Sequence, residues 1–302
     1  MPLKSQLHVN QLLSNVSVQY KNSEYIWDKV FPQIPVMKDT DLYRVYDRVF
    51  RVPETKRAPK GVAREFGFEF STSSYALEQH ALKDYVGVDE EENNDQGSLK
   101  VDTTENLTDA IYRRMELSVA SLFTTTNWSL NVSLAATAAW SANTTVSDPV
   151  PVFDTGATTI INNSGKTPNF AIMPRAEFIA VKNHVSVLDR VKYTSAEVSQ
   201  SMIQALIGVQ ELLIPTAVQD TAAEGVASSI SPFFADFAFL GWKPAGGGGI
   251  KTPSCGYTFI KAQPRVRSWM DDERNATAIE VEVKYQPKVV ASLTGYMIKD
   301  TV

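Results

Sequence analysis

Hydrophobic and polar residues alternate along residues 43–52, YRVYDRVFRV, in the pattern of a β-strand. Three phenylalanines, Phe66, Phe68 and Phe70, repeat at every second position further along the chain. The residues between the two runs, RVPETKRAPKGVAR (51–64), include two prolines, one glycine and five basic side chains. This order predicts a β-hairpin with a long basic loop at its far end.

The length of this hairpin indicates where it must lie. A strand of about twelve residues spans about 40 Å, whereas a compact chain of this size has a radius of gyration of about 19 Å. The hairpin should therefore project beyond its own domain. Because isolated two-stranded hairpins are only marginally stable in water, we expect a neighbouring subunit to receive it.

Helical periodicity marks the middle of the chain. Apolar side chains recur at spacings of three and four from Leu107 to Phe123, after a helix-start signature at Asp102 and Glu105. We therefore expect one long helix over 102–125. The next stretch, 127–165, is rich in Ser, Thr, Asn and Ala, and is expected to form short strands and loops.

The remaining residues predict alternating elements and then a β-rich end. Residues 168–184 fit a strand followed by a helix with Pro174 in its first turn. A capping box at Thr194 and Glu197 predicts a helix that ends at Gly208, followed by a buried strand at 210–215. Strand-like alternation then covers 257–262, 279–285 and part of 289–298, with a charged hairpin tip at 267–277. The predicted fold class is α+β.

Composition limits the possible functions. The 302 residues are 43% hydrophobic and 21% charged, which is typical of a folded globular protein. The net charge of −5 argues against a dedicated nucleic-acid-binding protein. Cys255 is the only cysteine, so no disulfide can form within the chain. With no signal-peptide pattern at the N-terminus, we expect a soluble protein of a reducing cytoplasm.

Candidate chemistry is sparse. Cys255 could pair with His184, but no family signature surrounds it, and a small core residue is the favoured interpretation. NSGKT (163–167) has Ile160 where a phosphate-binding loop needs glycine, so a turn is expected. DEEENNDQG (89–97) lacks the spacing of calcium ligands and is expected to be a solvated loop.

A cluster of charges near the predicted tip has two interpretations. Asp271, Asp272 and Glu273 could bind a metal or supply a general acid, but Arg267 and Arg274 flank them and favour an intersubunit or local ion-pair cluster. We therefore predict no catalytic residue, cofactor or metal, and a protein that is not an enzyme.

The order of several phrases resembles the major capsid proteins of tailed double-stranded DNA phages with the HK97 fold. The first is Trp27 to Val36 in the arm, followed by FRVPETKRAPKGVARE leading to FSTSSYALEQHAL, then ENLTDAIYRRMELSVASLF, PNFAIMPRAEFIAVKNHVSVLDRVKYT, PSCGYTFI and the closing VVASLTGYMIKDTV. The resemblance spans nearly the whole chain.

The resemblance implies a division of the chain. It comprises an N-terminal arm at 1–42, an extended hairpin or E-loop at 43–80, a peripheral domain at 81–144 and 256–288 with spine helix 102–125, and an axial domain at 145–255 and 289–302.

It also implies a function. Such proteins assemble as pentamers and hexamers into an icosahedral shell around phage DNA, so we expect a virion protein assembled in the bacterial host cytoplasm. Its expected partners are further copies of itself, a separate scaffold, a portal and decoration proteins, with no membrane and weak or no specific DNA contact. Because residue 1 lies almost directly at the arm, a separate scaffold or earlier cleavage is expected. The alternatives are an encapsulin-like compartment shell and a soluble hydrolase.

We expect intersubunit contacts at two groups of residues. The first comprises the loop and arm residues Arg51, Lys56, Arg57, Lys60, Arg64, Trp27 and Phe31, and the second comprises Arg267, Asp271, Asp272, Glu273 and Arg274. Some relatives crosslink a loop lysine to an asparagine on a neighbour. Lys56 and Lys60 lie in the corresponding loop, but nothing in the sequence identifies the asparagine, so no crosslink is assigned.

Overall fold

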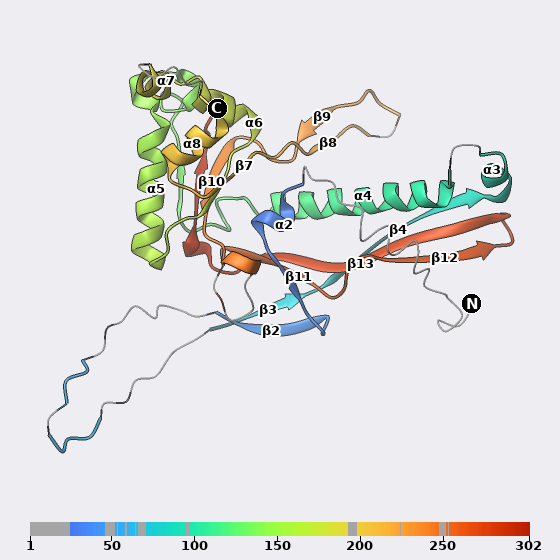
Figure 1. Cartoon of the computed structure of the whole chain (residues 1–302), viewed down its shortest axis with the longest axis horizontal. Coiled ribbons are helices and arrows are strands. Elements are labelled where there is room, and N and C mark those ends of the chain that lie inside the picture. Colours follow the sequence, from blue (N-terminus) through green and yellow to red (C-terminus); the bar gives the residue numbers. More distant parts are fainter. Residues whose placement is uncertain are drawn as a thin grey trace.

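A computed structural model describes most of the chain. The described residues are 25–45, 52, 54–57, 59–63, 65, 71–94, 97–192, 198–223, 225–247, 252 and 254–302. Figure 1 shows a long layer, built from a helix lying along a sheet, with a second body at one end of it and a loop that projects away from both.

The long layer contains a five-stranded sheet. Its strands are β1 (Gln33–Pro35), β11 (Gly256–Ile260), β13 (Ala276–Val289) and β12 (Arg265–Asp271) in that order, with β4 (Glu78–Gly87) also paired to β13. The helix α4 (Leu99–Ala120) lies along this sheet (Figure 1). Its Ile111, Met115 and Val119 share one hydrophobic core with Val281 and Val283 of β13. Two short helices, α2 (Trp27–Val30) and α3 (Val88–Glu92), flank α4.

The long helix was predicted, but its bounds were wrong. It begins three residues before the predicted 102 and ends five before the predicted 125. The residue before the helix is Ser98, so Asp102 lies inside the first turn. The buried face includes Thr104 and Thr108, whose hydroxyls donate to backbone carbonyls four residues earlier at 2.7 Å. Polar residues with such bonds are buried at little cost, which obscures the periodicity at the start of the helix.

The second body has its own sheet and core. The strand order is β5 (Asn131–Ser133), β14 (Gly295–Lys299), β10 (Phe237–Gly241), β6 (Phe170–Ile172) and β7 (Glu211–Leu213). Around it pack α5 (Pro149–Ser164), α6 (Arg175–Lys182), α7 (Val185–Val191) and α8 (Gln200–Ile207). Short 3-10 turns lie at Trp140–Ala142, Thr145–Ser147, Ala245–Gly247 and Ser292–Thr294.

The helix α5 contradicts the expectation of short strands and loops over 127–165. Its sequence, PVPVFDTGATTIINNS, is poor in helix formers and contains a central glycine. A Cβ added at Gly156 would lie 2.8 Å from Cδ1 of Tyr296. Close packing against β14 thus stabilises a helix that local propensity does not favour. The turn predicted at NSGKT is confirmed only in part: Asn163 and Ser164 are the last residues of α5, and Gly165 ends the helix with a left-handed φ of 65°.

Of the other predicted elements, some are confirmed by the structure and some are corrected. The strand and helix expected over 168–184 are β6 and α6, Gly208 ends α8, and β7 lies within 210–215. The capping box at 194 and 197 lies outside the described residues, and the described N-cap of α8 is Ser199. The acidic stretch 89–97 was predicted to be a loop, but it begins with the exposed helix α3.

Two hairpins project from the molecule. The first consists of β2 (Thr40–Val45) and β3 (Ser71–Ala76), joined by residues 46–70, which we call the projecting loop. Its return strand ends before the predicted 80, because β4 starts at Glu78 and belongs to the long sheet. The alternating runs at 46–50 and 66–70 lie outside the described residues. The second hairpin, β8 (Val218–Asp220) with β9 (Ile230–Pro232), was not predicted. Among the described residues, no helix is both long and apolar enough to cross a membrane.

Candidate intersubunit contact surfaces

The base of the first hairpin is fixed to the long sheet by aromatic packing. The ring centroids of Tyr75 and Phe259 lie 4.7 Å apart in a stacked arrangement, and Tyr43 packs 5.4 Å from the same ring. The backbone N–H of Ala76 donates to Oε1 of Gln286 at 2.8 Å, and Lys288 donates to the backbone at Ser74. The direction of the projecting loop is therefore set by the sheet.

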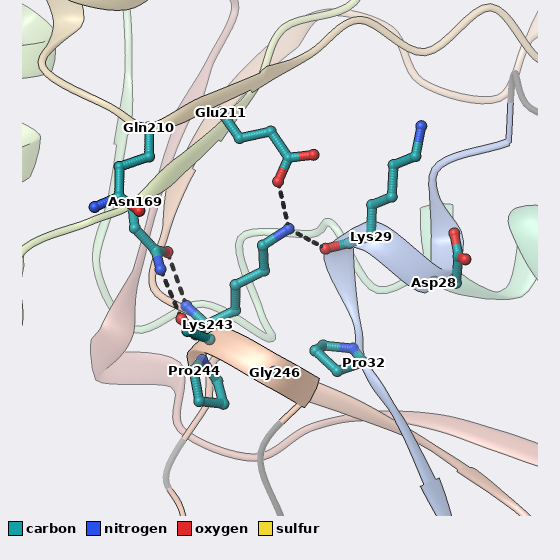
Figure 2. A pocket seen from close by; sticks show the side chains of 10 residues that line it. Asp28, Lys29, Pro32, Asn169, Gln210, Glu211, Lys243, Pro244 and Gly246 are labelled. Carbon is teal, nitrogen blue, oxygen red and sulfur yellow. Dashed lines mark hydrogen bonds and ion pairs between the residues drawn. The ribbon is translucent and has the colours of Figure 1, made fainter.

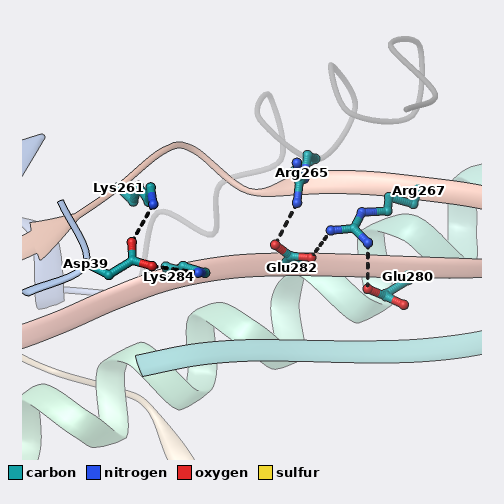
Figure 3. A network of polar contacts seen from close by, with 7 residues as sticks. All are labelled: Asp39, Lys261, Arg265, Arg267, Glu280, Glu282 and Lys284. Carbon is teal, nitrogen blue, oxygen red and sulfur yellow. Dashed lines mark hydrogen bonds and ion pairs between the residues drawn. The ribbon is translucent and has the colours of Figure 1, made fainter. Parts of the chain in front are cut away.

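An ionic contact strengthens this base. Asp39 lies just before β2 and accepts from Nζ of Lys261 on one carboxylate oxygen and from Nζ of Lys284 on the other, the latter at 3.0 Å (Figure 3). These two hydrogen bonds hold the pKa of Asp39 below its usual value. The start of the hairpin is thus joined to β13 and to the residue that follows β11.

The described part of the projecting loop is exposed. Lys56, Arg57 and Lys60 face solvent, and Arg57 donates to the carbonyl of Gly61. Two valines, Val52 and Val62, are 91% and 96% exposed. Arg51 and Arg64 lie outside the described residues. The loop therefore presents positive charge together with apolar side chains that have no cover within the described chain.

The charge cluster predicted at 267–277 is divided by the structure. Residues 267–271 belong to β12, and the tip itself comprises only 272–275. Arg267 points away from the tip carboxylates to Glu282, which also accepts from Arg265 at 2.8 Å (Figure 3). Its second contact is with Glu280 at 4.0 Å. Arg267 therefore makes no local pair with Asp271, Asp272 or Glu273, since cross-strand register places it opposite Glu280. An intersubunit contact of this cluster stays a prediction.

The other members of the predicted cluster lie at the tip or at the end of β12 beside it. Nε of Arg274 lies 3.9 Å from Oδ2 of Asp271, and its guanidinium lies 4.3 Å from the ring centroid of Tyr85. Asp272 and Glu273 are exposed. Within the described part of the chain, no group of three acidic, histidine or cysteine side chains could hold a metal ion. The tip is an exposed charged surface.

Two arm residues predicted at an intersubunit contact are used inside the chain. Trp27 is 5% exposed and stacks on Tyr112, whereas Phe31 is fully buried and stacks on Phe123. A Cβ at Gly256 would lie only 2.4 Å from the Phe31 ring. The expectation for Trp27 and Phe31 is corrected: their aromatic surfaces anchor the arm to its own long layer.

A shallow cavity of about 320 Å³ lies where the arm meets the second body (Figure 2). Nζ of Lys243 donates to the carbonyl of Lys29 at 2.5 Å and to Glu211 at 2.7 Å. The side chain of Asn169 makes two hydrogen bonds to the backbone of Lys243, at 2.6 and 3.0 Å. These groups satisfy one another, so the cavity is a structural junction between arm and second body. Nothing in the sequence pattern indicates this junction.

The structure confirms that Cys255 is a small core residue and does not support its pairing with His184. Cys255 is fully buried, and burial raises the pKa of its thiol to about 12. His184 makes a 2.8 Å hydrogen bond to the Ser147 hydroxyl, and its other ring nitrogen accepts from the N–H of Ser186. A thiol with so high a pKa is a poor nucleophile at neutral pH. Both residues have structural roles.

One known protein is similar to this chain over nearly its whole length. No family model matches the chain. The major capsid protein of Burkholderia phage BcepMu is 23% identical over 302 residues, a match that covers 96% of this chain and 95% of that protein.

Solved structures share the fold. A phage-related protein from Bordetella bronchiseptica RB50 superposes with a TM-score of 0.81 at 24% identity, covering 98% of each chain. The capsid of cyanophage P-SCSP1u gives a TM-score of 0.63 at 11% identity, covering 91% of this chain and 88% of that one. The α+β fold of phage capsid proteins, expected from the resemblance in the sequence, is confirmed.

Proposed function

We propose that this protein is the major capsid protein of a tailed phage. Many copies assemble as pentamers and hexamers into an icosahedral shell that encloses double-stranded DNA. One observation carries the proposal: a phage major capsid protein matches the chain from end to end, over 96% of one and 95% of the other. The shared fold with phage capsid structures supports it.

The geometry suits a shell subunit. A hairpin with a fixed base and an exposed loop can reach a neighbouring copy, whereas a free subunit gains nothing from it. The net charge of −5 also suits a wall around DNA, because a strongly basic lining would bind phosphate tightly. The contacts between copies, and no chemical turnover, would then be the function of the chain.

We assign the domains from the two sheets. The arm ends near 39, the E-loop hairpin spans 40–76, the peripheral domain is the long layer, and the axial domain is the second body. The expected boundary at 144 moves to about 130, because β5 pairs with β14 of the second sheet. The spine helix is α4.

The remaining parts of the proposal concern partners and place. A separate scaffold, a portal and decoration proteins would join the shell, which would be assembled in the bacterial cytoplasm and retained in the virion. No membrane, cofactor or enzymatic activity is part of this function. A compartment shell of the encapsulin kind is the alternative with the same fold.

Electron microscopy tests the proposal directly. The protein is produced in bacteria, purified and viewed by negative stain, and closed shells of uniform size are the expected result. A monomer at every concentration, with and without co-produced scaffold, would contradict it. Mass spectrometry of the shells then separates the alternatives, because an enzyme present in fixed proportion indicates a compartment shell.

A further inference from the structure

The second hairpin presents an apolar face that the rest of the described chain leaves uncovered. Val218 pairs with Pro232, and Asp220 pairs with Ile230, so these four side chains share one face. Val218 is 48% exposed and Ile230 is 63% exposed. Val226, in the connection between the strands, is also exposed. At the base of the second hairpin, the N–H of Phe233 donates to the carbonyl of Ala217 at 3.0 Å.

The second hairpin carries only negative charge. Residues 216–233 contain two acidic side chains, Asp220 and Glu224, and no lysine or arginine. Asp220 accepts from the Ser228 hydroxyl and from the N–H groups of Ala222 and Ser229, and these bonds, that from Ser228 above all, hold its pKa below the usual value. Its carboxylate is therefore negative at neutral pH. An acidic, apolar surface of this kind fits a basic, apolar partner.

The projecting loop has the complementary character. Residues 51–64 contain five basic side chains and one acidic one, a net charge of +4. Its described cations, Lys56, Arg57 and Lys60, are exposed beside Val52 and Val62. In Figure 1 the described residues of the projecting loop lie at the lower left, whereas β8 and β9 lie at the upper right, so a contact between them would join two copies.

We infer that the second hairpin is the surface on which the projecting loop of a neighbouring copy docks. The inference rests on the proposed function and names the contact that the loop makes. A loop on one side and its receptor on the other form a heterologous, head-to-tail interface, which forms a ring where the rotation between successive copies closes. The valines of the loop would cover the Val218 and Ile230 face, and its cations would lie near Asp220.

Charge exchange tests the inference. Reversing the loop (Lys56→Glu, Arg57→Glu and Lys60→Glu) is expected to lower the fraction of chains in closed shells by about tenfold or more, because like charges then face each other. Placing two lysines on the hairpin (Ala223→Lys and Ala227→Lys) cancels its two negative charges and should also lower this fraction, because the attraction to the basic loop is lost. Combining the two sets should restore shells. If the combined variant assembles no better than either parent set, the docking inference is overturned.

A disulfide provides a second, independent measurement on assembled particles. With Val62→Cys and Ile230→Cys in one chain, mild oxidation should link neighbouring copies into a ladder of multimers on non-reducing gels. The buried Cys255 stays as it is. The matched control pairs Val62→Cys with Ile161→Cys, an exposed position on α5, and should give no ladder. If the wild type forms shells but the test variant gives no ladder, only the docking contact is refuted. If the wild type forms no shells, the proposed function itself is refuted.

Discussion

The carboxylate of Glu116, buried on α4, accepts a hydrogen bond of 2.8 Å from the backbone N–H of Trp27, 89 residues earlier in the chain. The N–H of Ile26 donates to the same carboxylate at 3.1 Å. Glu116 thus attaches the arm to the long helix at the point where α2 begins, beside the 3.0 Å hydrogen bond that the Tyr25 hydroxyl donates to Asp109 of the same helix. Burial raises the pKa of Glu116 to about 7, and the two backbone hydrogen bonds only partly oppose that rise.

This pKa gives the stability of the subunit a defined pH dependence. At a pH between 4.5 and about 7, Glu116 is protonated in the folded chain but ionised in the unfolded chain, where its pKa is 4.5. Stability is therefore greatest below the unfolded pKa and falls as pH rises from about 4.5 to about 7, by up to about 3 kcal/mol. Urea denaturation of the unassembled subunit, followed by tryptophan fluorescence, measures this change.

Two variants separate charge from hydrogen bonding. Glu116→Gln keeps an acceptor but cannot ionise, so the difference between it and the wild type should grow in favour of the variant as pH rises to about 7. Glu116→Leu leaves the N–H groups of Ile26 and Trp27 unsatisfied and should cost about 1–3 kcal/mol even at pH 5. A wild type and a Gln variant with parallel pH profiles would show that Glu116 does not titrate in this range.

The packing of α5 leads to a second prediction. Gly156→Ala improves helix propensity but places a methyl group against the Tyr296 ring. Overpacking of this kind should outweigh the propensity gain and destabilise the subunit by about 1–3 kcal/mol. Thr158→Ala, at an exposed position of the same helix, is the control and should be neutral or slightly stabilising. Equal midpoints in thermal unfolding for the two variants would contradict the packing argument.

The same helix shows what the sequence could and could not reveal. Elements with strong periodicity, such as α4, and with clear stop signals, such as Gly208, were predicted because local chemistry determines them. The helix α5 was missed because its stabilising contact, Gly156 with Tyr296, joins residues 140 positions apart. No local pattern records such a contact.

The candidate contact surfaces, too, could be predicted from the sequence only in part. Exposed charge in the projecting loop and at the tip was visible in the sequence. The separation of Arg267 from Arg274 was not, because it depends on the register in which β12 pairs with β13. Trp27 and Phe31 were misassigned for a related reason: aromatic residues in an aperiodic arm fit a partner's surface and the chain's own core equally well.

The separation of the two arginines is itself testable. Arg267→Glu would place three acidic groups together, with Glu280 and Glu282, and should destabilise the isolated subunit by about 1–3 kcal/mol. Arg274→Glu changes an exposed tip residue and should alter subunit stability by less than about 0.5 kcal/mol. Denaturant midpoints measure both. A stable Arg267→Glu subunit would show that the cross-strand pair is dispensable.

The state of the thiol gives a test of the structural role of Cys255. Because the pKa of this buried group is about 12, almost none of it is thiolate at neutral pH, and access to it is closed. Native protein should therefore resist iodoacetamide for hours, whereas protein in urea should be labelled completely. Rapid labelling of the native subunit, measured by mass spectrometry, would reopen the hydrolase alternative.

The projecting loop should matter for assembly and very little for folding. Replacing residues 53–63 with two glycines removes the exposed cations and Val62, but leaves the base contacts of Tyr43, Tyr75 and Asp39 unchanged. The shortened subunit should unfold within a few degrees of the wild type and form no closed shells. A second variant, in which the eleven residues become a Gly/Ser linker of equal length, separates reach from chemistry. If the loop acts through its side chains, both variants fail to assemble, whereas normal shells from the linker variant would show that chain length alone is required.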